Sequence, residues 1–167
     1  GYDSDVGTLA NGKITVTNTQ ETVEVEVDKA WLNADGSKTW PNGVTVGIQL
    51  TADGSDVTGK TATLSADQTS YKFTSLPKYK ADGTTAIAYS VKEAAVPGYE
   101  SEVGTLTNGK ITVTNTQETI EVEVDKAWLN AGGSTAWPDG VTVEIQLTAD
   151  GSAVSGKTAT LSATQTS

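Results

Sequence analysis

Residues 23–31 read Val-Glu-Val-Glu-Val-Asp-Lys-Ala-Trp, a stretch that alternates apolar and acidic side chains. A period of two is typical of a β-strand with one buried face and one exposed face. The three valines and Trp31 share a face, which we therefore predict to be buried. Lys29 is also one of these alternate positions, so we expect its side chain to be directed toward the core. Because an unpaired buried ammonium group is costly, Lys29 is expected to have a partner or to lose its proton.

The rest of the chain also predicts β-strands, and no segment has a sustained helical period. Alternating stretches cover residues 44–50, 61–65, 71–76, 86–93 and 110–116, and Asp-Gly, Asn-Gly and Pro-Gly turn signals separate them. Short alternating strands of this kind indicate a β-sandwich. The side chains predicted to point inward are Val44, Val46, Ile48, Leu50, Tyr71, Phe73, Ile87, Tyr89, Val91, Ile111 and Val113.

The chain repeats itself with a period of 97 residues, because the stretch that begins at Gly1 returns at Gly98. Between the two copies, 58 of 70 aligned positions are identical. A period of this size corresponds to a whole domain rather than to a solenoid repeat. We therefore predict three parts: the C-terminal strand of a preceding repeat in 1–20, a complete repeat in 21–117, and the N-terminal half of a following repeat in 118–167.

Composition argues against several classes of function. The chain has no His, Cys or Met and a formal net charge of -10. It therefore lacks the usual transition-metal ligands and the usual catalytic base or thiol, and we expect no cofactor, no metal and no turnover enzyme. An acidic chain without a basic cluster is a poor partner for nucleic acid or anionic membranes. No apolar run approaches the roughly 18 residues of a membrane span.

Two further polar residues extend predicted apolar faces. Glu93 follows Tyr89 and Val91 with the same parity, and Asn115 follows Ile111 and Val113. Each of these side chains, taken alone, is readily explained by a strand end that opens to water. Together with Lys29 they also suggest a buried salt bridge between Lys29 and Glu93 that is hydrogen-bonded to Asn115.

A third interpretation is an intramolecular amide, or isopeptide, bond. Burial favours the neutral amine of lysine, which is a nucleophile, and the neutral acid form of glutamate. A protonated Glu93 would hydrogen-bond the Asn115 carbonyl, polarise it toward attack by Lys29, and shuttle protons as ammonia leaves. Folding itself would supply the effective concentration. The event would occur once per domain, without turnover.

The sequence resembles the Cna-B domain, the B-type repeat of the collagen adhesin of Gram-positive cocci. The matching motifs are VDKAW (27–31), WPNGVTVGIQLTADG (40–54), TATLS (61–65), YSVKE (89–93) and ITVTNT (111–116). The resemblance implies a prealbumin-like or inverse IgG-like β-sandwich in tandem repeats. One departure is Trp40 before Pro41, where the family often has arginine.

The resemblance also implies residue roles and a setting. It assigns the isopeptide cross-link to Lys29 and Asn115 and the proton-shuttle role to Glu93. Asn18 and Lys126 are the equivalents in the partial repeats, and we expect both to be unpaired within this chain. The implied function is a structural stalk module of an adhesin or pilin-like surface protein. Such a module is extracellular and cell-wall anchored in a Gram-positive bacterium, with adjacent repeats as partners and host or matrix ligands bound through other domains.

An alternative function is a carbohydrate- or protein-binding adhesin module. Trp40 and Trp137 lie in the loops TWPNG and AWPDG, where an exposed indole ring could stack on a sugar. Such a tryptophan more often caps a sandwich. The loop NADGS at 33–37 resembles a calcium loop only in its acidity, because it lacks the required ligand spacing.

Overall fold

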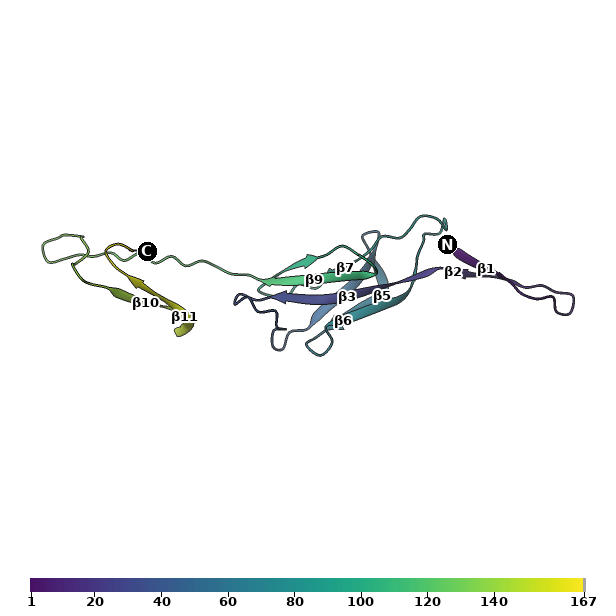
Figure 1. The fold of residues 1–167 in the computed structure, drawn as a ribbon, viewed down its shortest axis with the longest axis horizontal. Helices are drawn as coiled ribbons and strands as arrows, with labels where there is room; N and C mark the ends of the chain where they lie inside the picture. Colours follow the sequence, from purple (N-terminus) through teal and green to yellow (C-terminus); the bar gives the residue numbers. More distant parts are fainter. Residues whose placement is uncertain (167) are drawn as a thin grey trace. The chain divides into compact units, whose positions relative to one another are not determined.

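The computed structural model describes residues 1–166, and the chain divides into two compact units, Gly1–Thr119 and Ile120–Ser167. Figure 1 shows that the strands of the complete repeat form the layered part of the first unit.

The complete repeat is a sandwich of two sheets. One sheet has the strand order β6-β3-β9-β8, and the other has the order β5-β4-β7. The strands of the first sheet are β3 (Thr22–Leu32), β6 (Ser70–Pro77), β8 (Tyr99–Val103) and β9 (Lys110–Gln117). Those of the second are β4 (Val46–Ala52), β5 (Ser55–Leu64) and β7 (Tyr89–Glu93). The predicted all-β sandwich is confirmed.

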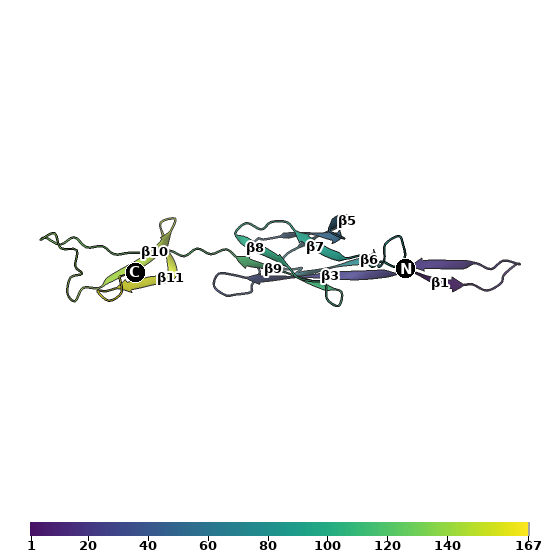
Figure 2. The same cartoon turned by 90° about the horizontal axis from the view of Figure 1, so that it is seen from above.

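The first and last strands of the repeat, β3 and β9, are parallel neighbours, whereas the other paired strands are antiparallel. Figure 2 shows β3 and β9 along the same sheet. Their register places Lys29 beside Val113 and Trp31 beside Asn115. Side chains of alternate residues share a face, so Lys29 and Asn115 point to the same side of the sheet, between the two layers.

The core contains side chains from both sheets, as the alternation predicts. The buried apolar residues are Val25, Val27, Trp31, Val46, Ile48, Leu50, Leu64, Phe73, Leu76, Tyr89, Val91, Val96, Ile111 and Val113. Tyr71 differs from expectation, because it is 37% exposed. It lies on the edge strand β6 and packs edge-on against Phe73, so only part of its ring is covered.

The Asp-Gly and Asn-Gly signals form the expected tight turns. Asp53 and Gly54, between β4 and β5, have φ angles of 49° and 81°. Asn108 and Gly109, before β9, have φ angles of 51° and 79°. Two consecutive positive φ angles are characteristic of the hairpin turn that matches strand twist, and Asn, Asp and Gly tolerate this conformation best.

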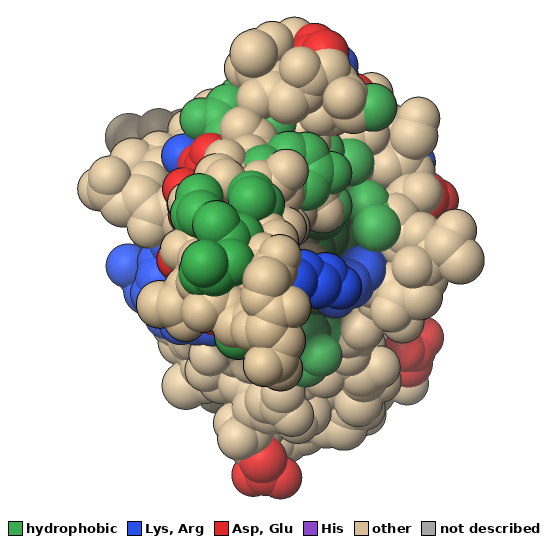
Figure 3. Space-filling view, turned by 90° about the vertical axis from the view of Figure 1, so that its right-hand side faces the viewer, with side chains coloured by type: hydrophobic (Ala, Val, Ile, Leu, Met, Phe, Trp, Pro, Cys, Tyr) green, Lys and Arg blue, Asp and Glu red, His purple; other side chains and the backbone are tan. Residues whose placement is uncertain are grey.

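Residues 1–20, where the sequence predicts the last strand of a repeat, form a two-stranded hairpin. Its strands are β1 (Tyr2–Val6) and β2 (Val16–Gln20), and it repeats the β8–β9 pair, with Ser4 opposite Asn18 as Ser101 is opposite Asn115. Within residues 1–166, β2 pairs with its hairpin partner alone, in contrast to β9. The hairpin therefore exposes apolar side chains, namely Tyr2, Val6, Leu9, Ile14 and Val16. Figure 3 shows hydrophobic side chains open to solvent on the face that it draws.

The second unit contains one hairpin, β10 (Val143–Ala149) and β11 (Ser152–Leu161). Its register repeats that of β4 and β5, including the irregularity after the glutamine. Residues 120–129, the counterpart of most of β3, form no described strand, and Ile120 is 88% exposed. Among the described residues of both units, no helix is long and apolar enough to cross a membrane.

Candidate functional site

Three polar residues from three strands meet in the core of the complete repeat. Lys29 comes from β3, Glu93 from the end of β7 and Asn115 from β9. The side chains of Lys29 and Glu93 are 0% and 1% exposed, and Asn115 is fully buried. The sandwich thus brings together the three residues that strand parity singles out.

The Lys29 ammonium group has few polar partners. Its Nζ atom lies 3.9 Å from Oε1 of Glu93 and donates hydrogen bonds to the backbone carbonyl oxygens of Ala30, at 2.9 Å, and Val113, at 3.1 Å. It also lies 4.4 Å from the centroid of the Trp31 ring. Burial lowers the pKa of Lys29 to about 8, and the Glu93 charge opposes this shift only in part. With this pKa a minority of Lys29 side chains is neutral near physiological pH, far more than for an exposed lysine, and the neutral amine is the nucleophilic form.

Glu93 bridges the lysine and the asparagine through one oxygen. Nδ2 of Asn115 donates a hydrogen bond of 3.0 Å to Oε1 of Glu93. The buried Oδ1 atom of Asn115 has no described hydrogen-bond partner. This differs from the expected contact, in which the Asn115 carbonyl faces a protonated Glu93. A carboxylate only accepts hydrogen bonds, so the donor end of the carboxamide faces it.

The second carboxylate oxygen of Glu93 accepts a hydrogen bond from the hydroxyl of Ser101 on β8. Sequence reasoning missed this residue. The sequence feature that could have identified Ser101 is its position two residues after Tyr99, which places both side chains on the same face of β8. The Tyr99 ring packs edge-on against Trp31, with 5.0 Å between the ring centroids.

Aromatic rings cover the cluster. Trp31 packs edge-on against Tyr99 and against Trp40, at 5.2 Å, and the Tyr99 hydroxyl donates to Oδ1 of Asn33. Trp40 is half-buried, and its Nε1 donates to the Val44 carbonyl oxygen at 2.8 Å. These contacts favour a capping role for Trp40 over a sugar-stacking role. Trp137 makes the equivalent contacts, to Val141 and Trp128.

The equivalents in the partial repeats have different surroundings. Asn18 lies on β2 and is exposed. Lys126 is half-buried, and its Nζ lies 4.2 Å from the Trp128 ring, which repeats the Lys29–Trp31 contact. Within residues 1–166, no salt bridge or side-chain hydrogen bond joins either residue to a carboxylate.

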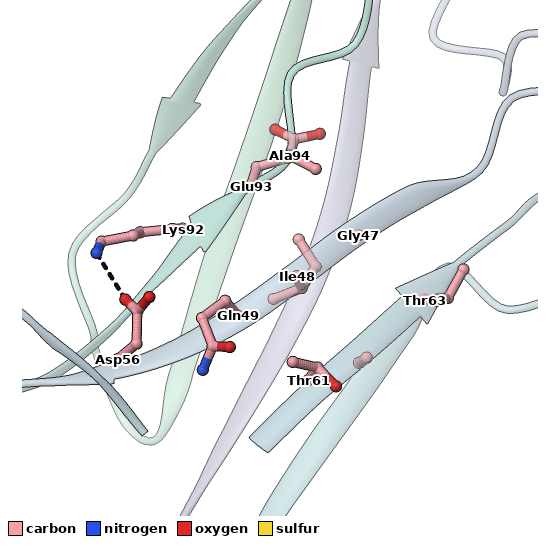
Figure 4. A pocket seen from close by; sticks show the side chains of 10 residues that line it. Gly47, Ile48, Gln49, Asp56, Thr61, Thr63, Lys92, Glu93 and Ala94 are labelled. Atoms are coloured by element: carbon pink, nitrogen blue, oxygen red, sulfur yellow. Dashed lines mark hydrogen bonds and ion pairs between the residues drawn. The ribbon is translucent and has the colours of Figure 1, made fainter. Parts of the chain in front are cut away.

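A shallow hollow lies on strands β4, β5 and β7, beside the cluster. Lys92 and Asp56 form an ion pair there (Figure 4), and Nζ of Lys92 lies 2.6 Å from Oδ1 of Asp56. Both side chains are more than half exposed, so the pair contributes little to stability. In the second copy, Ala153 replaces Asp56. Across the part of the chain that the structure describes, no group of three or more Asp or Glu side chains is arranged to hold a metal ion.

These features define a class: an all-β module in which parallel first and last strands hold a buried lysine and a buried asparagine on either side of a glutamate. The family model of the Cna protein B-type domain matches residues 25–116, which is more than half of the chain. The chain therefore belongs to the Cna B-type domain family.

Solved structures of surface proteins are similar to this chain. The single B repeat unit (B1) of the collagen binding surface protein Cna of Staphylococcus aureus is 28% identical, with a TM-score of 0.50. That match covers 71% of this chain and 60% of the B1 structure, so this chain corresponds to less than two thirds of that structure.

Two other matches have lower TM-scores. The two-repeat B1B2 structure of the same S. aureus protein is 26% identical, covers 96% of this chain and 41% of that one, and has a TM-score of 0.46. The pilus backbone protein RrgB of Streptococcus pneumoniae is 22% identical, covers 62% of this chain and 25% of that one, and has a TM-score of 0.46. The comparison with curated protein sequences finds no match.

Proposed function

We propose that the complete repeat is a structural stalk module, stiffened by a self-formed isopeptide bond between Lys29 and Asn115. The observation that carries the proposal is the position of Glu93 Oε1, which lies 3.9 Å from Lys29 Nζ and 3.0 Å from Asn115 Nδ2. One oxygen can therefore accept a proton from the attacking amine and deliver it to the departing one.

The reaction starts with proton transfer from the Lys29 ammonium group to Glu93. The neutral Nζ then attacks Cγ of Asn115, the Nζ–Cγ bond forms and the Cγ–Nδ2 bond breaks. Two protons leave Nζ in all, and both end on the departing nitrogen, which is released as ammonium. Glu93 is a carboxylate before and after, so the group acts as a shuttle and is not consumed.

Burial supports this chemistry in two ways. Desolvation lowers the pKa of Lys29 to about 8, which makes the neutral amine accessible. The neighbouring strands β3 and β9 fix the two reacting side chains on one face of the sheet, so that the reaction is intramolecular. The cross-link then joins the first strand of the repeat to the last.

The proposed setting is the outer surface of a Gram-positive bacterium, in a cell-wall-anchored protein with adjacent repeats as neighbours. The similarity to a repeat of a collagen binding surface protein supports this setting. The 97-residue period of the sequence supports a tandem array, in which residues 1–20 and 118–167 belong to neighbouring repeats. Ligands of the host or matrix would be bound by other domains.

Intact-mass spectrometry of the full chain tests the proposal. The expected mass is that of the sequence minus one ammonia, and digestion should yield one branched peptide that joins Lys29 to Asn115. The same digest should contain Asn18 and Lys126 in linear peptides. A chain of full sequence mass after folding would contradict the proposal.

A further inference from the structure

We propose that Ser101 is a positioning residue for isopeptide formation, which directs the proton of Glu93 toward the reacting pair. This inference rests on the proposed function. The Ser101 hydroxyl donates to Oε2 of Glu93, while Oε1 faces Lys29 and Asn115. The two oxygens of one carboxylate therefore have different partners.

The place of Ser101 in the fold explains why it reaches Glu93. Ser101 lies directly opposite Asn115 in the antiparallel β8–β9 pair, at an exposed position of β8. β8 is an edge strand, and Glu93 ends the edge strand β7 of the other sheet. The hydrogen bond between Ser101 and Glu93 thus joins the two sheets at the edge where the chain passes from β7 to β8.

Distance and the hydrogen bond together determine which oxygen carries the proton. Oε1 lies 3.9 Å from Nζ of Lys29, so it is the oxygen that receives the proton. Oε2, held by the hydrogen bond from the Ser101 hydroxyl, then serves as the carbonyl oxygen of the neutral acid. Oε1 also lies 3.0 Å from the leaving nitrogen. Without the hydroxyl, the proton divides between the two oxygens and the carboxyl group is free to rotate about its last bond.

The step that Ser101 assists is the proton transfer described above, so it adds no reactant and no product. Lys29 gives a proton to Oε1, and Oε1 gives it to Nδ2 of Asn115 as the Cγ–Nδ2 bond breaks. The Ser101 hydroxyl keeps its own proton throughout. Its contribution is orientation, and we expect its loss to slow linkage roughly tenfold, as for one hydrogen bond to a charged group.

A pair of substitutions of the same shape tests the role of the hydroxyl. Ser101→Thr keeps the hydroxyl and Ser101→Val replaces it with a methyl group, and both residues are favourable in a strand. Each full-length chain is made by chemical synthesis, refolded by dilution from concentrated urea, and followed by intact mass until one ammonia is lost. Far-UV circular dichroism at the first time point establishes that each chain has folded before linkage is timed.

The chain supplies a matched control in Ser4, the equivalent serine in the N-terminal hairpin. Ser4 lies on β1, opposite Asn18 on β2. Within residues 1–166, no side-chain hydrogen bond is described for Ser4. We expect Ser4→Val and Ser101→Thr to link at about the wild-type rate, and Ser101→Val to link roughly tenfold more slowly.

Two results would overturn the inference while leaving the proposed function intact. One is linkage of Ser101→Val at the wild-type rate. The other is equal slowing of the Thr and Val variants, which would assign the effect to shape and not to the hydroxyl. If the wild-type chain itself never loses ammonia, the proposed function fails, and the inference about Ser101 fails with it.

Discussion

Oε1 of Glu93 lies 3.0 Å from Nδ2 of Asn115, and both side chains are enclosed between the two sheets. The same oxygen is 3.9 Å from Nζ of Lys29. These contacts are those of a buried salt bridge that is hydrogen-bonded to Asn115, and they are also the contacts that an amide exchange requires. The loss of one ammonia on folding distinguishes the two interpretations.

Glu93→Gln is expected to fold but to remain unlinked. Glutamine has the shape of glutamate and retains hydrogen-bonding capacity toward Ser101 and Asn115, but it cannot take up and release the shuttled proton. The mass of the purified variant should equal the mass of its sequence, without loss of ammonia. Glu102→Gln is the matched control, because Glu102 is an exposed residue of β8. Linkage of Glu93→Gln at the wild-type level would remove Glu93 from the mechanism.

The rate of linkage should be independent of pH just below about 8 and fall above it. The reacting state, with a neutral lysine and a neutral glutamic acid, contains the same number of protons as the ion pair. Raising the pH up to the Lys29 pKa of about 8 therefore does not lower the population of this reacting state relative to the ion pair. Above that pH the pair loses its proton, and the rate should fall about tenfold per pH unit.

Refolding of the synthetic chain in buffers on both sides of pH 8 measures this profile. The fold should be checked in each buffer by circular dichroism, so that loss of structure at high pH is not mistaken for loss of chemistry. A rate that rises above the Lys29 pKa of about 8 would show that the free amine reacts without a proton from Glu93.

Strand parity is sufficient to predict the sandwich and the inward direction of Lys29, Glu93 and Asn115. Side chains on a strand alternate strictly, so a polar residue that continues an apolar face is visible in the sequence. Parity cannot show which strands are neighbours. The parallel pairing of β3 with β9 and the contact between Ser101 and Glu93 depend on how the two sheets close, which is set by tertiary packing.

The partial copies illustrate the same limit. Residues 1–20 contain the same alternation as 98–117, yet β2 is exposed where alternate residues of β9 are buried, because among the described residues β2 pairs with β1 and with no counterpart of β3. Asn115 is thus buried because β3 lies beside β9, and the sequence of its own segment does not determine its burial.

The cross-link should stabilise the complete repeat by about 4–5 kcal/mol, by analogy with the loop-closure entropy of a disulfide of similar span. A double variant, Lys29→Met with Glu93→Gln, has neither the bond nor a buried charge. The double substitution avoids leaving Lys29 or Glu93 alone as an unpaired buried ion in the unlinked variant, which would itself destabilise the fold. Urea unfolding of the linked wild type and of the double variant measures the difference. Equal unfolding midpoints and slopes would contradict a stabilising cross-link.

Mechanical load provides the most direct test of the stalk function. Because β3 and β9 are parallel neighbours, a force that pulls on the start of β3 and the end of β9 acts along the strands in opposite directions. An isopeptide bond between Lys29 and Asn115 would carry this force from the first strand to the last, so the residues between them would bear no load.

In single-molecule stretching, the linked complete repeat should therefore show no unfolding step, even at forces that unfold unlinked domains. The double variant Lys29→Met with Glu93→Gln should unfold and release the chain between residues 29 and 115, roughly 300 Å when fully extended. The double variant is also the control for attachment, because its unfolding step shows that force reaches this domain. A wild-type chain that loses ammonia on folding and still releases the same length would show that the bond lies outside the path of the force. In that case the cross-link would stabilise the fold without stiffening a stalk.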